Sequence, residues 1–420
     1  MSRWHRILVV SFIAQFVALV GFSFVFPFLP LYIQTLGIHG AGPVALWSGV
    51  LSFSLSIAMA LVSPIWGTIA DRYGRKPMVV RAMVAGSITT GLMIVAPNIW
   101  AVLLLRILQG VFTGSVSASQ ALVASVTPRE KMGFSMGMMQ SAVFSGAAAG
   151  PLIGGFLDDH LGFHGTFAVG TVLLLVAAIL VFFFVDESFT PPVAVPGQSR
   201  NPLTNMRRVA ASPGLIAVAI VLFMAEFANV IPSPVAALLV AQLKGVPLLH
   251  GQAQTSTAVG IVLAIAGICA AISSTLAQRM TNRFGYRRVM IGGIALAGVF
   301  YVPAVFVDSV WQLVLSRAAI GASLGLAMPA ASAIIGLITP EKQRASAYSM
   351  TASASSFGIA FGPLVGGGIG ALYGLRPVFL VTSILLIAVS GAIAALIQEP
   401  RIDDVLSPAS PTPEVVAARR

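Results

Sequence analysis

Residues 67–77 read GTIADRYGRKP, and residues 278–288 read QRMTNRFGYRR. The two stretches match at one constant offset, at which Arg72, Gly74 and Lys76 align with Arg283, Gly285 and Arg287. The same offset aligns Arg106 with Arg317, and a shift of one residue aligns Gly150-Pro151-Leu152 with Gly362-Pro363-Leu364. Several matches in the same order predict that the chain consists of two duplicated halves.

The composition places the chain in a membrane. Of its 420 residues, 57% are hydrophobic and 9% are charged, whereas about 25% of the residues of a soluble domain are charged. So few charges could not cover the surface of a water-soluble globule of this length. The composition therefore excludes a soluble enzyme, a disordered protein, a collagen-like fibre and a coiled coil. The single cysteine, Cys269, excludes a disulfide framework.

Twelve apolar runs are long enough to cross a bilayer, for which a helix needs about 20 residues. They lie at 7–33, 47–70, 78–96, 99–126, 132–157, 163–185, 214–240, 254–278, 289–307, 311–338, 346–371 and 377–397. Because lipid offers the backbone no hydrogen-bond partner, we expect an all-α membrane protein. The Pro-rich stretch at 186–212 separates the runs into two sets. This division predicts a six-helix bundle over 1–185, a linker over 186–212, a second bundle over 213–397 and a disordered tail over 398–420.

The connections between the apolar runs differ strongly in their Lys and Arg content. One side of the membrane receives nearly all of the Lys and Arg residues, and the other side receives only Lys244 and Arg376. Arg106 and Arg317 lie inside apolar runs. Because basic connections face the cytoplasm, we expect both termini there, in a plasma membrane or in the inner membrane of a bacterium. A cleaved signal peptide is the alternative for the basic start, but the first run is too long for one. These connections account for the net charge of +11, so we expect no nucleic-acid partner.

The stretch at 67–76 combines a turn-forming glycine with charges that can pair. Gly74 permits a tight turn, and Asp71 can pair with a basic neighbour or cap a helix N-terminus. The spacing of Gly67, Asp71, Arg72, Gly74, Arg75 and Lys76 resembles the loop motif of the major facilitator superfamily. This resemblance implies two six-helix bundles related by pseudo-two-fold symmetry, and it implies that the motif takes part in gating. The alternative is a basic loop that only sets the orientation in the membrane.

A second motif lies in the fifth apolar run, where residues 146–155 read GAAAGPLIGG. Small residues four positions apart allow helices to approach closely, and a proline inside a helix removes a backbone donor. Ordinary helix packing would also account for these glycines. The arrangement of Gly146, Gly150, Pro151, Gly154 and Gly155 resembles the antiporter motif of drug:proton exporters within the same superfamily. This resemblance implies export rather than uptake.

One acidic residue lies inside an apolar run. Glu226 is near the middle of the run at 214–240, and Asn229 follows it by one turn. A carboxylate at mid-membrane costs about 2.5–3.5 kcal/mol on insertion scales, so it usually faces an interior cavity and is a candidate proton carrier. Arg106 resembles an arginine in helix 4 of the superfamily that is implicated in proton transfer. Both residues could instead be structural, and coupling could use another ion or none.

Asn229 and four other side chains are candidates for the wall of a substrate cavity. Phe22, Phe26 and Phe144 would suit an apolar cavity, although most phenylalanines of membrane helices face lipid. Gln109 follows Arg106 in the way that the helix 4 motif of the superfamily leads us to expect. The five histidines are scattered, so we expect no metal site, and the absence of a GxxxxGK[ST] sequence argues against ATP as an energy source. No cofactor is expected.

These features predict a monomeric secondary transporter that exports a small molecule in exchange for protons by alternating access. The substrate is expected to be lipophilic, with a cation as one option. An exporter of sugars or other metabolites is the alternative within transport, and it would need a cavity rich in hydroxyl and amide groups. A membrane sensor would need a signalling domain, for which the tail after Gln398 is too short. A membrane enzyme would need catalytic residues clustered at one membrane face, and the sequence has no such cluster.

Overall fold

The computed structural model of the chain describes residues 3–24, 28–128, 131–187, 213–243, 255–338 and 344–396. Within these ranges every regular element is a helix, which confirms the all-α prediction. The first half contains α1 (Arg3–Ser23), α2 (Leu29–Thr35), α3 (Ala41–Tyr73), α4 (Lys76–Met93), α5 (Ile99–Phe112), α6 (Ser115–Val126) and α7 (Met132–Phe184). The second half contains α9 (Pro213–Val230), α10 (Ser233–Gln242), α11 (Thr255–Phe284), α12 (Tyr286–Tyr301), η2 (Pro303–Val305), α13 (Val310–Ile338), α14 (Arg344–Tyr373) and α15 (Leu375–Leu396).

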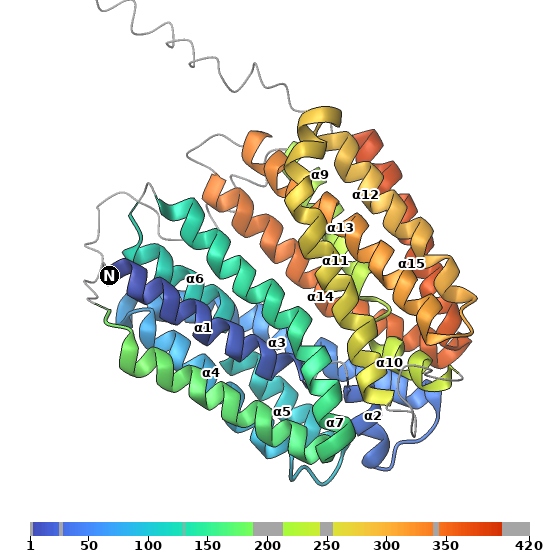
Figure 1. Cartoon of the computed structure of the whole chain (residues 1–420), viewed down its shortest axis with the longest axis horizontal. Coiled ribbons are helices and arrows are strands. Elements are labelled where there is room, and N and C mark those ends of the chain that lie inside the picture. The colour runs from blue at the N-terminus through green and yellow to red at the C-terminus, as the bar shows by residue number, and fades with distance from the viewer. Residues whose placement is uncertain are drawn as a thin grey trace, which may run out of the picture.

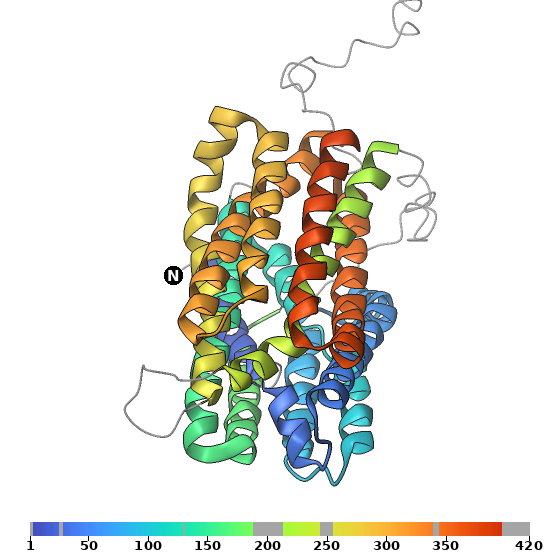
Figure 2. The same ribbon diagram turned by 90° about the vertical axis from the view of Figure 1, so that its right-hand side faces the viewer.

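The helices form two bundles that lie side by side (Figure 1). The first bundle comprises α1 to α7, and the second comprises α9 to α15. The closest packing between them is that of α7 against α11 and of α3 against α14, and the short helix α10 also contacts α2 and α3. Figure 2 shows the second bundle with α15 towards the viewer and its long helices running roughly alongside one another. The boundaries predicted at 186–212 and 398–420 stay predictions, because residues 188–212 and 397–420 lie outside the described ranges.

The described helices accommodate the twelve predicted crossings. Ten helical stretches among them are long and apolar enough to cross a membrane. One of these stretches, Phe134–Phe184, has 51 residues and is long enough for two crossings. Its chain turns at Gly162, whose φ of 68° is accessible to glycine without a steric penalty. The 18 residues of α4 occupy the third predicted run.

Three of the predicted runs are divided into two helices. The first run contains α1 and α2. The fourth run is divided at Gly114, which has a φ of 112° and precedes α6; the sequence did not lead us to expect this break. The seventh run is divided at Pro232, between α9 and α10, because proline lacks the backbone N–H that a continuous helix needs. In contrast, Pro151 lies inside α7, where the only non-helical backbone is at Gly162.

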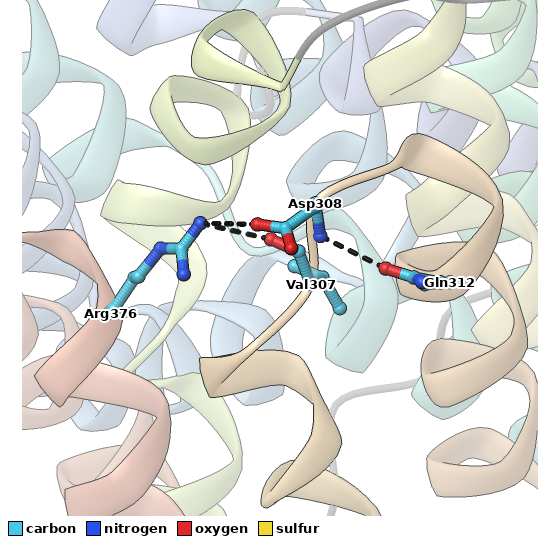
Figure 3. Close-up of polar contacts among 4 residues, drawn as sticks. All are labelled: Val307, Asp308, Gln312 and Arg376. Carbon is cyan, nitrogen blue, oxygen red and sulfur yellow. Dashed lines mark hydrogen bonds and ion pairs between the residues drawn. The ribbon is translucent and has the colours of Figure 1, made fainter.

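The molecule has two ends, which we name by their connections. The terminal end carries Arg3 at the start of α1 and Leu396 at the end of α15. The distal end carries the connections at 36–40, 94–98, 158–162 and 306–309. Figure 3 shows a contact at the distal end, where Arg376 donates hydrogen bonds to the Asp308 carboxylate at 3.1 Å and to the Val307 carbonyl at 3.0 Å. This contact joins the first turn of α15 to the connection before α13, both in the second bundle.

The largest cluster of buried apolar side chains is continuous across both bundles. It includes Tyr32 and Val44 of the first bundle and Val235, Val259 and Tyr301 of the second. Several of these side chains come from α2, α10 and the distal parts of longer helices. Because burial of apolar surface lets side chains pack at close-packed density, the two bundles are packed together at the distal end.

Candidate functional site

A buried polar cluster lies inside the first bundle around Arg106. The guanidinium of Arg106 is 3% exposed, and its Nη1 donates a hydrogen bond to Oε1 of Gln109 at 3.1 Å. The amide nitrogen of Gln109 donates onward to the hydroxyl of Thr90 on α4 at 3.3 Å. Nε and Nη2 of Arg106 have no hydrogen-bond partner among the described residues. The cluster therefore holds a buried positive charge that is paired only with neutral groups.

Gln15 on α1 is a second buried polar side chain of the first bundle. It is fully buried, and neither atom of its amide has a hydrogen-bond partner within the described part of the chain. An amide that is buried without hydrogen bonds costs free energy. The complete burial of Gln15 is information that the structure adds to the sequence.

Glu226 lies on α9, where its Cβ is close to α14. A Cβ built on Gly358 of α14 would be 3.3 Å from the Cβ of Glu226. The Glu226 side chain is partly exposed, as is that of Asn229. Within the described ranges, no ion pair or hydrogen bond engages the Glu226 carboxyl group. This acidic group is therefore not fixed to a cation of the described bundle.

An apolar groove lies between α9, the helix that carries Glu226, and α14. It has a volume of about 570 Å³ and is lined by Ile216, Ala219, Ile220, Phe223, Ala354, Phe357 and Phe361 of α9 and α14. Phe223 is one turn before Glu226 on α9, and Phe357 directly precedes Gly358, the residue of α14 that faces Glu226. Phe361 also contacts Phe53 of α3, with ring centroids 5.1 Å apart. The groove thus lies in the second bundle and borders the first.

The glycines of the second motif face two different partners. Gly146, Gly150 and Gly154 pack against α1, where an added Cβ would contact Leu19, Ser23 and Phe24 respectively. Gly155 instead faces the second bundle, because an added Cβ would overlap the backbone of Ser256 on α11. In the same contact, a Cβ on Gly260 of α11 would overlap the carbonyl oxygen of Pro151. The motif therefore permits close packing both within the first bundle and between the bundles.

The loop motif is mostly helical. α3 continues to Tyr73, so the turn consists only of Gly74, with a φ of 98°, and Arg75. The backbone N–H groups of Arg75 and Lys76 donate to the carboxylate of Glu187 at distances between 2.8 and 3.0 Å. The side chains of Asp71 and Arg72, and the surroundings of Gly67, lie outside the described part of the structure. The predicted gating contacts of Asp71 therefore stay a prediction.

The phenylalanines that were candidates for the cavity wall have different surroundings. The ring of Phe22 lies against Gly86 of α4, inside the first bundle. Phe144 on α7 is 54% exposed. Phe26 lies outside the described residues. The structure does not bring Phe22 and Phe144 together with Glu226. The aromatic residues nearest to Glu226 in sequence are Phe223 and Phe227, and neither was predicted to line the cavity.

Asp158 and Asp159 make a contact that sequence analysis missed. Both carboxylates lie at the corner between the two crossings of α7, and they accept hydrogen bonds from Ser256 and Thr257 at the start of α11. Burial raises the pKa of the Asp158 carboxyl to about 6, and the hydrogen bond from the Ser256 hydroxyl opposes this increase. The one signal in the sequence was their position directly after the second motif.

The comparisons with known proteins identify the family. The family model described as Major Facilitator Superfamily matches residues 11–253 and 218–418. A protein named "Multi-drug resistance efflux pump PmrA homolog" from Lactococcus lactis is 33% identical over 391 residues, which cover 92% of this chain and 93% of that one. A "Multidrug resistance protein MdtG" from Salmonella arizonae is 32% identical over 385 residues, which cover 91% and 93%.

Solved structures of low sequence identity share the fold. A D-xylose-proton symporter has a TM-score of 0.76 at 14% identity, covering 95% of this chain and 99% of that one. An inward-facing, occupied bacterial homolog of the human lysosomal transporter Spinster has a TM-score of 0.75 at 16% identity, covering 97% and 100%. These matches agree with the two-bundle fold described above. The chain belongs to the major facilitator superfamily, and it is a membrane transporter rather than an enzyme.

Proposed function

We propose that this transporter exports lipophilic, cationic small molecules in exchange for protons. The observation that carries the proposal is the position of Glu226, whose carboxyl group has no partner among the described residues, on a helix that also lines an apolar groove. Such a group can bind either a proton or a cation, but not both at once, and this competition couples the two ligands. The names of the relatives, which describe multidrug efflux and resistance, support export.

The groove supports a lipophilic substrate over a sugar. Its lining residues are aliphatic or aromatic and offer no side-chain hydroxyl or amide group. A sugar would leave its hydroxyl groups without partners there, which costs free energy for each buried group. An apolar body next to a single carboxyl group suits a lipophilic cation, because burial supplies most of the affinity and the charge supplies orientation.

The duplicated bundles support an alternating-access mechanism. Two bundles that enclose a site can expose it to one side and then to the other. In this scheme the substrate enters from the cytoplasm or the inner leaflet, and protonation of Glu226 from outside favours its release. We propose that both termini face the cytoplasm, that the chain acts as a monomer, and that the loop motif around Asp71 contributes to gating.

The buried cluster around Arg106 supports an electrostatic role in the first bundle. Its guanidinium carries a charge that the described residues do not neutralise. A buried positive charge lowers the cost of an ionised carboxyl group nearby, so it favours release of the proton from such a group. We propose that Arg106 assists proton transfer, with Gln109 holding the guanidinium in place.

The test is transport into or out of proteoliposomes under an imposed pH gradient. Glu226→Gln removes the titratable proton but keeps the size and polarity of the side chain. We expect the native protein to move a lipophilic cation against its gradient, and we expect the variant to lose this gradient-driven transport. Asp308→Asn is a matched control, because Asp308 is an exposed acid whose ion pair lies within the second bundle.

Two results would contradict the proposal. If Glu226→Gln responded to the pH gradient as the native protein does, the proton would use another site. If the native protein moved a neutral sugar through the same pathway but no lipophilic cation, the assignment of the groove would be wrong.

A further inference from the structure

Two neighbouring acids of the first bundle contact the first turn of a helix in the second. Asp159 accepts hydrogen bonds from the backbone N–H groups of Ser256 at 3.2 Å and Thr257 at 2.7 Å. Asp158 accepts a hydrogen bond from the Ser256 hydroxyl at 2.5 Å. The contact lies at the distal end, beside the close approach of Gly155 to Ser256. It therefore joins the two bundles where they are packed together.

The two carboxyl groups have opposite environments. Asp159 is partly exposed and caps the start of α11, where free N–H groups and the helix dipole stabilise a negative charge. Asp158 is 8% exposed, and its Oδ1 is buried without a hydrogen-bond partner among the described residues. An ionised carboxylate with one unsatisfied oxygen is costly in such a place. The closed contact thus favours a neutral Asp158, whereas both oxygens of Asp159 accept hydrogen bonds from backbone N–H groups.

No described Lys or Arg compensates for the charge of Asp158, and the imidazole of His160, two residues further along α7, is exposed and contacts the Phe156 carbonyl instead. Asp159 is its charged neighbour on α7, and a second negative charge makes ionisation of Asp158 harder. The first charged residue of α11 is Arg279, several turns away, and α2 and α10 contain no charged residue. The charged residues of α1, such as Arg6, lie at its terminal end. The described residues therefore do not offset the free-energy cost of ionising Asp158 in this contact.

We propose that Asp158 is a second protonation site of the transporter, at which proton uptake favours closure of the distal end and proton loss favours its opening. When the bundles separate at the distal end, water reaches the carboxylate and stabilises its ionised form. The closed state then binds one more proton than the open state. By linkage, a fall in pH shifts the population towards the closed state.

This site fits a defined step of the exchange cycle. If the distal end faces outward, a proton that arrives from outside after substrate release would neutralise Asp158 and close that end. This assignment to a step rests on the proposed function, whereas the pH-dependent closure rests on the contact alone. The two can be tested separately, because closure can be measured without substrate and without a gradient.

The experiment measures the distance between the bundles at the distal end as a function of pH. His160 on α7 and Leu372 on α14 are exposed, so both can be replaced by cysteine and spin-labelled in full-length protein carrying Cys269→Ala. Electron–electron distance measurements in nanodiscs then report the closed and open populations. We expect the closed-to-open ratio to rise about tenfold from about pH 7.5 to about pH 5, across the range where Asp158 takes up its proton.

Substitutions of the two acids should act in opposite directions. Asp158→Asn mimics the neutral form of the side chain. The distal end of this variant should therefore stay closed at both pH values and lose the pH response. Asp159→Asn removes the charge that caps α11, so it should lower the closed population. Ser256→Ala removes the hydrogen bond that stabilises ionised Asp158, so it should move the midpoint of closure to higher pH. Asp308→Asn, at the same end but within one bundle, should match the native protein.

Several outcomes would overturn the proposal. It is wrong if Asp158→Asn keeps the native pH response, or if the native distances do not depend on pH. It is also wrong if Asp158→Asn opens the distal end as Asp159→Asn does, because the carboxylate would then be a simple cap. If closure follows pH as expected while Glu226→Gln transports normally, the closure site stands and the proposed role of Glu226 fails.

Discussion

Arg106 donates a hydrogen bond from Nη1 to Oε1 of Gln109, 3.1 Å away and one turn further along α5. Gln109 in turn donates to Thr90 on α4, so one amide connects the buried charge to a neighbouring helix. The repeat offset that aligns Arg106 with Arg317 also aligns Thr90 with Tyr301 and Gln109 with Ile320. In the second bundle the guanidinium of Arg317 lies 5.9 Å from the centre of the Tyr301 ring. The duplicated halves thus keep the arginine but differ in what positions it.

We expect Gln109→Leu to destabilise the protein by about 1–3 kcal/mol, because it removes the hydrogen-bond partner of a buried charge. Thermal unfolding in detergent would measure the loss. Thr90→Val is the comparison, since it removes only the second hydrogen bond and should cost less. If Gln109→Leu unfolded at the same temperature as the native protein, the hydrogen bond would contribute nothing to positioning Arg106.

Gly155→Ala should weaken the contact between the bundles. Its added Cβ would overlap the backbone of Ser256, which cannot move aside as a flexible side chain can. Overpacking of this kind costs about 1–3 kcal/mol, and we expect it to lower the population that is closed at the distal end. Distance measurements between His160 and Leu372 would detect the change. Gly137→Ala on the same helix is the control, because its added Cβ would meet no atom within 4 Å; equal effects of the two substitutions would contradict the expectation.

Glu187 acts as a helix cap that comes from a distant part of the sequence. α4 has no side-chain cap of its own, and the Glu187 carboxylate accepts hydrogen bonds from the N–H groups of Arg75 and Lys76 instead. We expect Glu187→Ala to reduce stability by about 1–2 kcal/mol, as measured by thermal unfolding. Asp186→Asn should have a smaller effect, since its ion pair with Arg6 is exposed. A larger loss in Asp186→Asn would show that the cap is not what anchors this end of α4.

Local sequence predicted the features that depend on local chemistry. Long apolar runs specify crossings in any lipid, so the all-helical fold and the twelve crossings followed from length and composition. Gly74 and its repeat partner Gly285 both adopt positive φ at the turns expected from the duplicated motif. Pro232 divides the seventh run because proline cannot donate a backbone hydrogen bond.

Contacts between distant residues could not be predicted in the same way. Glu187 reaches the start of α4 across 112 positions, and Asp158 reaches Ser256 across 98. Each of these acids lies at the end of an apolar run, where any polar residue fits the local pattern. Only the packing of the helices decides which N–H or hydroxyl group lies within reach. The break at Gly114 is a similar case, since a single glycine in a membrane helix is usually tolerated without a change of direction.

The last prediction concerns the apolar groove between α9 and α14. Phe223 and Phe357 contribute aromatic surface to its lining, and burial of such surface stabilises a lipophilic ligand by about 25 cal/mol per Å². We expect Phe223→Ala and Phe357→Ala each to raise the substrate concentration needed for half-maximal transport by about three- to tenfold, which corresponds to the loss of about 0.7–1.4 kcal/mol. Phe183→Ala is the matched control, because that ring is 68% exposed on α7. Transport rates measured over a range of substrate concentrations in proteoliposomes would distinguish a binding defect from a general defect. Loss of a binding surface raises the concentration for half-maximal transport, whereas a general defect lowers the maximal rate. If Phe183→Ala changed the affinity as strongly as the groove variants, the groove would not be the place where the substrate binds.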